Sequence, residues 1–97
     1  MQPSLQEVQR RLSMARDGLS RRYPIRRIGI FGSTARGEAG PESDVDVLVE
    51  FSEPVGFEVA DLAEELEILL DCRVDLVTSG AVREAMRHYV ERDLVYV

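Results

Sequence analysis

The chain has 97 residues, of which 44% are apolar and 31% are charged, and a formal net charge of −6. This size and composition predict one soluble globular domain over residues 1–97, and the negative charge argues against a protein that binds nucleic acid directly. No apolar run is long enough to cross a bilayer, the N-terminus has no signal-peptide core, and Cys72 is the single cysteine, so we expect a cytoplasmic protein outside any membrane.

Hydrophobic spacing in the first third of the chain predicts a helix, a strand and a second, shorter helix. Over residues 4–22, apolar side chains recur at steps of three and four, as in an amphipathic helix. Residues 25–31 read as a strand. Residues 33–38 read as the first turns of a short helix.

The rest of the chain continues this alternation. Residues 44–51, with the sequence DVDVLVEF, form the clearest strand pattern. An amphipathic helix over 57–71, a strand over 73–77 and a helix from Gly80 follow, and the apolar tail 94–97 predicts either an edge strand or a docking segment. The helix from Gly80 is expected to bury an apolar face made of Val82, Ala85, Met86, Tyr89 and Val90. We also expect Met14 and Met86 to fill the core.

This order of elements predicts an α/β (α+β) fold. A small mixed sheet would carry helices packed mainly on one of its faces, because each amphipathic helix has to bury one side.

A glycine-serine turn at the end of the first strand predicts a site for an anion. Gly32 lets the backbone approach a ligand closely, and the helix that follows offers free N–H groups and the positive end of its dipole. Ser33 adds a hydroxyl, and Arg36 adds a charged guanidinium one turn later. The spacing Gly32 to Gly37 also matches the opening of a Walker A loop, but all 12 basic residues are Arg, so the lysine of a P-loop is missing and we reject that class.

Paired aspartates predict a metal site. Asp44 and Asp46 share one face of their strand, about 6.6 Å apart at Cα, so their carboxylates can converge on divalent cations. If residues 73–77 pair beside this strand, Asp75 completes a carboxylate triad of the hard oxygen ligands that Mg²⁺ prefers. The competing interpretation is a solvated acidic face, and the Gly-Ser turn directly upstream favours the metal site.

Together these motifs resemble a known superfamily. The stretch from Phe31 to Gly37, followed by Ser43 to Asp46, is similar to the signature of the DNA polymerase beta-like nucleotidyltransferases, and within them to the minimal nucleotidyltransferases (MNT proteins). The resemblance covers most of the chain. The resemblance implies that the phosphates are contacted by Gly32, Ser33 and Arg36. It implies that Mg²⁺ is bound by Asp44 and Asp46. Asp75 would be the third carboxylate, a metal ligand that also helps to activate the attacking hydroxyl.

The resemblance also implies an activity and a partner. MNT proteins transfer AMP from ATP to a tyrosine of a HEPN-domain ribonuclease toxin, with two Mg²⁺ ions, so this chain would be the antitoxin of a two-gene module and part of a hetero-oligomer. Two alternatives stay open: neutralisation of the partner by binding alone, and nucleotidyl transfer to a small molecule. The short chain favours a protein acceptor, which would dock on the acidic helix 57–71 or the tail 94–97, although a plain solvated helix side is the simpler explanation of the acidic residues.

Overall fold

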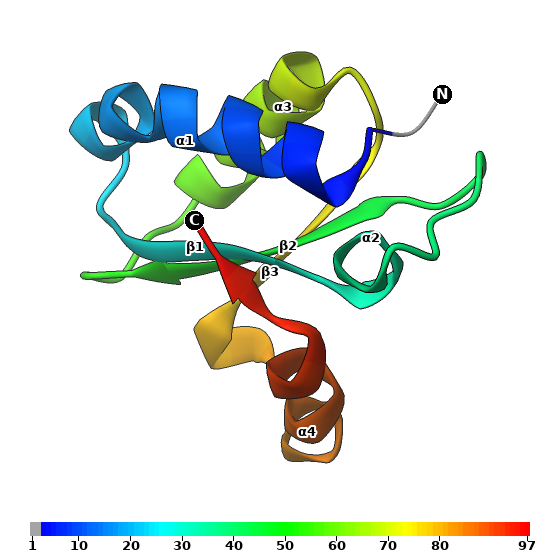
Figure 1. Ribbon diagram of the computed structural model, residues 1–97. Helices are drawn as coiled ribbons and strands as arrows, with labels where there is room; N and C mark the ends of the chain where they lie inside the picture. Colours follow the sequence, from blue (N-terminus) through cyan, green and yellow to red (C-terminus); the bar gives the residue numbers. More distant parts are fainter. Residues whose placement is uncertain (1–2) are drawn as a thin grey trace.

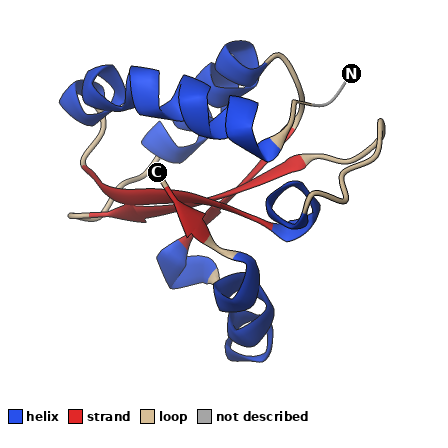
Figure 2. Cartoon of the chain, viewed as in Figure 1, coloured by secondary structure: helices blue, strands red, loops and turns tan. Residues whose placement is uncertain are grey.

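The computed structural model describes residues 3–97, whose helices and strands are shown in Figures 1 and 2. None of the helices in this range combines the length and the apolar character that spanning a bilayer requires. The helices are α1 (Leu5–Arg22), α2 (Gly32–Arg36), α3 (Glu58–Leu70) and α4 (Glu84–Asp93), with a 3₁₀ turn, η1 (Ser79–Ala81), before α4. The strands are β1 (Ile25–Phe31), β2 (Val45–Phe51), β3 (Val74–Thr78) and β4 (Val95–Tyr96).

The strands of residues 3–97 form one mixed sheet in the order β3-β2-β1-β4. Strand β2 runs antiparallel to β1 and parallel to β3, and β4 runs antiparallel to the free side of β1. The apolar tail is therefore an edge strand, in which Val95 pairs with Ile30 and Tyr96 pairs with Gly29. A small mixed sheet among helices is the fold that the sequence predicts.

The two long helices, α1 and α3, cover one face of the sheet, and the core lies between them and the strands (Figure 1). Because side chains alternate along a strand, every second residue of β2 points into this core. The buried apolar residues that meet here are Val8, Leu12 and Leu19 of α1, Ile28 and Ile30 of β1, Val45, Val47 and Val49 of β2, and Leu62, Leu66 and Leu70 of α3.

The opposite face of the sheet carries η1 and α4, and α4 points away from the strands (Figure 1). This helix begins at Glu84 and not at Gly80, because Val82 and Arg83 have extended backbone with ψ of 119° and 147°. Of its apolar residues, Val90 is buried while Met86 is 55% exposed. The prediction that Met86 fills the core is therefore wrong, since only the last turns of α4 reach the sheet.

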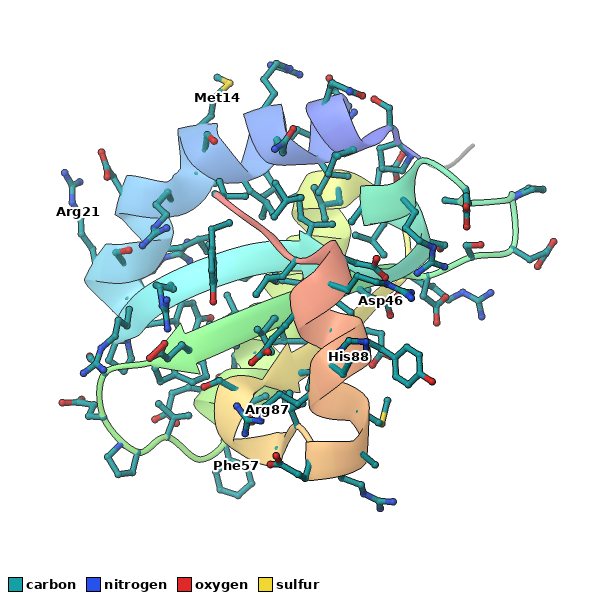
Figure 3. All side chains as sticks on the ribbon, turned by 60° about the horizontal axis from the view of Figure 1, so that its bottom comes forward. Met14, Arg21, Asp46, Phe57, Arg87 and His88 are labelled. Atoms are coloured by element: carbon teal, nitrogen blue, oxygen red, sulfur yellow. The ribbon has the colours of Figure 1, made fainter. Side chains whose placement is uncertain are left out.

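The prediction for Met14 is also wrong. This side chain lies on the outer side of α1, 75% exposed, and points to solvent (Figure 3). The period of three and four residues is satisfied without it, because Val8, Leu12 and Leu19 already form the buried side of the helix.

Candidate active site

The glycine-serine turn is built where β1 runs directly into α2. Gly32 has a φ of +73°, a conformation that L side chains rarely adopt. A Cβ at this position would also collide with the carboxylate of Asp46. Gly32 is therefore a glycine for two reasons, the turn itself and the acidic side chain that lies against its α-carbon.

Asp46 and Asp75 are brought together by the register of two parallel strands. Asp46 of β2 pairs with Asp75 of β3 on one side and with Phe31 of β1 on the other. Paired residues of neighbouring strands point to the same face, here the α4 side of the sheet, where Figure 3 shows Asp46. The carboxylate of Asp75 raises the pKa of Asp46 by its charge and by hydrogen bonding.

The electrostatics of this pair favour a bound cation. Burial, and next the negative charges of Asp75 and Asp44, raise the pKa of Asp46 from its ordinary value of 3.8 to about 6, against a smaller opposite effect of Arg36. Asp46 is half-buried and Asp75 is exposed, and the repulsion between the two carboxylates can be relieved either by a proton or by a cation.

Asp44 has a different partner from the other two aspartates. It precedes β2, is exposed, and forms an ion pair with Arg73, with 3.4 Å between Oδ1 and Nε. In the part of the chain that the structure describes, no three acidic, histidine or cysteine side chains lie close enough to hold one ion together. Asp46 and Asp75 nevertheless fit Mg²⁺, because this ion is typically held by one or two carboxylates and completes its shell with water and substrate phosphates. Asp44 would join them by leaving Arg73.

Arg36 lies at the end of α2, where its guanidinium is held by two acidic groups. Nε donates to Glu38 at 2.9 Å, and Nη1 donates to Asp93 of α4 at 2.6 Å. These interactions raise the pKa of Arg36, Glu38 contributing most and Asp93 next. A bound phosphate would therefore have to compete with Glu38 and Asp93 for the guanidinium of Arg36, or bind it alongside them.

A pocket of about 420 Å³ opens beside the carboxylate pair, between the sheet and α4. Asp46 and Asp75 line it, together with the charged side chain of Arg83. The remaining lining is apolar and comes from four elements and the segment between them, namely Phe31, Val77, Ala81, Val82, Met86 and Val90. Met86 is thus part of this wall and not of the core.

Two site residues could not be found from the sequence. Asp93 is 57 positions from Arg36 and Arg73 is 29 positions from Asp44, so only the assembled fold shows that they meet. The one local signal is Arg73, the basic residue directly before β3. It points to Asp44 only once β3 is known to pair with β2.

Comparison with known proteins places this geometry in a family. Residues 12–96 match the nucleotidyltransferase domain family. The protein adenylyltransferase MntA of Thermococcus cleftensis is 42% identical over 95 residues, which is 97% of this chain and 96% of the relative.

Solved structures agree with the sequence comparison. A candidate minimal nucleotidyltransferase has a TM-score of 0.80 and 35% identity, over 96% of this chain and 95% of its own. A second similar structure is a tri-AMPylated Shewanella oneidensis HEPN toxin in complex with its MNT antitoxin, with a TM-score of 0.69 over 92% of this chain and 70% of that one, and its 22% identity shows likeness of fold alone. The chain is a nucleotidyltransferase and belongs to the nucleotidyltransferase domain family, with the minimal nucleotidyltransferases as the members that its motifs resemble.

Proposed function

We propose that this chain is a Mg²⁺-dependent protein adenylyltransferase that transfers AMP from ATP to a tyrosine of a HEPN-domain toxin and so acts as its antitoxin. The Thermococcus relative, a protein adenylyltransferase by name, supports the reaction. The complex of an MNT antitoxin with an AMPylated HEPN toxin supports the kind of partner. The reaction would take place in the cytoplasm, where ATP is available, through a single domain.

The carboxylate pair beside the glycine turn is the observation that carries this proposal. Gly32 and Ser33 would hold the β- and γ-phosphates of ATP with backbone N–H groups, which places the α-phosphate next to Asp46. Two Mg²⁺ ions held by Asp46, Asp75 and a reoriented Asp44 would lower the pKa of the acceptor hydroxyl and neutralise the leaving pyrophosphate.

The chain's own groups would align the reaction. The tyrosine oxygen forms a bond to the α-phosphorus while the bond from that phosphorus to the bridging oxygen of pyrophosphate breaks, in line with it. The proton of the hydroxyl passes to the carboxylate of Asp75. Because most of the catalysis is positioning and charge neutralisation, small displacements of these side chains are expected to be costly.

The test is an incubation of the full chain with ATP, Mg²⁺ and the HEPN-domain protein encoded beside it, read by intact-mass analysis. We expect the partner to gain one or more AMP units. Asp44→Asn and Asp46→Asn should each lower the rate by more than about a hundredfold while the fold is kept, since each removes a metal ligand. Asp17→Asn is a matched control, because Asp17 is exposed on α1, on the other side of the sheet.

The same incubation separates the alternatives. A tight complex without a change of mass would show neutralisation by binding alone. AMP transfer to a small hydroxyl compound but not to the protein would show a small-molecule enzyme. Normal turnover by Asp44→Asn or Asp46→Asn would remove the metal-ligand assignment itself.

A further inference from the structure

The pocket beside Asp46 and Asp75 has a chemical character that neither the phosphates nor the metal explains. Its lining combines the two carboxylates and Arg83 with a larger number of apolar side chains. Part of this apolar lining is solvent-exposed in the structure, since Met86 of α4 is 55% exposed. An apolar wall next to a charged centre favours a ligand group with an apolar body and a polar tip.

The order of strands places this pocket on the acceptor side of the reaction. Across the sheet, the turn at Gly32 ends β1, Asp46 lies on β2 and Asp75 lies on β3. Pyrophosphate leaves from the turn, and an in-line attack must come from the opposite direction. Gly32 and Ser33 do not line the pocket, whereas Asp75 does.

We propose that this pocket binds the phenol ring of the acceptor tyrosine, with the hydroxyl directed at Asp46 and Asp75. The inference rests on the proposed function and adds the recognition of the acceptor to it. A serine or threonine hydroxyl has no body to fill the apolar wall. The polar edge of an adenine ring would find only Arg83 besides the carboxylates, while Met86 can adapt to an aromatic ring and contact its edge.

Binding can be tested with N-acetyl-tyrosinamide as the probe. The full chain is loaded with Mg²⁺ and α,β-methylene-ATP, whose α–β bond cannot be cleaved, and the methyl signals of Val77, Val82 and Met86 are followed by NMR. We expect N-acetyl-tyrosinamide to shift these signals in a saturable way at millimolar concentrations. N-acetyl-serinamide should leave them unchanged.

Two variants narrow the pocket, and each has a matched control. Ala81→Phe fills the pocket from η1, and its control Ser13→Phe adds the same ring to an exposed position of α1, on the other side of the sheet. We expect Ala81→Phe to weaken N-acetyl-tyrosinamide binding and AMP transfer to the HEPN partner by about tenfold or more, with nucleotide affinity within about twofold of wild type. Met86→Glu should act in the same way, and Met14→Glu should not.

Other outcomes overturn either this proposal or the proposed function. If α,β-methylene-ATP alone shifts the three methyl signals and Ala81→Phe weakens its binding, the pocket holds the nucleotide base. If the tyrosine probe shifts none of the three signals, or if Ser13→Phe lowers probe binding and AMP transfer as much as Ala81→Phe does, the pocket is not the acceptor site. A wild-type chain that binds the tyrosine probe here but transfers no AMP to its partner would instead refute the proposed function.

Discussion

At the residue scale, Gly32 and Gly37 offer a matched pair. Both have a positive φ, +73° and +74°, but a Cβ at Gly32 would meet Asp46, whereas a Cβ at Gly37 meets nothing within 4 Å. Gly37→Ala should therefore cost only the conformational strain, about 1 kcal/mol of unfolding free energy. Gly32→Ala should cost about 2–4 kcal/mol, because it also displaces a half-buried carboxylate.

Urea unfolding of both variants measures this difference, and titration with Mg²⁺ and ATP shows its functional side. We expect only Gly32→Ala to lose nucleotide affinity. Equal losses of stability in the two variants would mean that Asp46 does not lie against the turn in solution.

Asp46 is expected to destabilise the metal-free protein at neutral pH. Its pKa is about 6 in the folded state against an ordinary 3.8, so between these values the folded state binds more protons than the unfolded state, and the free energy of unfolding falls as the pH rises. The contribution of Asp46 to the free energy of unfolding is fully present below about pH 4 and is lost as the pH rises through about 6. Because the group is about half-exposed, the two-unit shift is screened to an effect of about 1 kcal/mol.

Asp46→Asn removes this titration, so the metal-free variant should be more stable than the wild type by about 1 kcal/mol at pH 8. The difference should shrink as the pH is lowered towards 4. Urea unfolding in EDTA at several pH values measures it, and added Mg²⁺ should stabilise only the wild type. A variant that is less stable than the wild type at pH 8 would show that Asp46 supports the fold.

At the element scale, one ion pair joins the short helix after the turn to the last helix. The side chain of Asp93 is 7% exposed, and its carboxylate accepts hydrogen bonds from Arg36 and Arg92. Burial acts to raise the pKa of Asp93, but the two guanidinium groups prevail and hold it below its ordinary value. The end of α4 therefore holds the guanidinium that the sequence assigns to the phosphates.

Substitutions at the two ends of this pair separate its roles. Arg36→Gln and Asp93→Asn should both lower the melting temperature, because each breaks the link between α2 and α4. Only Arg36→Gln should also weaken the binding of α,β-methylene-ATP with Mg²⁺, if Arg36 contacts phosphate. Unchanged nucleotide affinity in Arg36→Gln would limit this residue to a structural role.

The elements that carry the candidate site could be predicted because their signals are local. The alternation in residues 44–51 fixes which side chains of β2 face the core, and it therefore places Asp46 on the other side with no further information. The position of α4 could not be predicted, since Met86 and Tyr89 follow a helical period that normally marks a buried face. What α4 covers depends on the extended backbone at Val82 and Arg83 and on β4 pairing with β1, which are decided by distant residues.

At the scale of the whole molecule, one face of the sheet packs the core and the other carries the candidate active site. The α1 and α3 side carries the tightly buried core, while the α4 side carries the carboxylates, the pocket and only a few buried side chains. This division lets the reactive face stay open without unfolding the sheet. It also means that stability and catalysis should respond to different substitutions.

Leu66 and Ile68 of α3 test that division, because they lie two residues apart on one helix, 0% and 82% exposed. Leu66→Ala should lower the free energy of unfolding by about 2–5 kcal/mol through lost burial and the cavity left behind. Ile68→Ala should change it by no more than about 0.5 kcal/mol. Urea unfolding measures both, and the folded fraction of each variant should bind α,β-methylene-ATP with Mg²⁺ as the wild type does. If folded Leu66→Ala instead loses its nucleotide affinity, the core side of the sheet sets the geometry of the carboxylates, and the two faces are not independent.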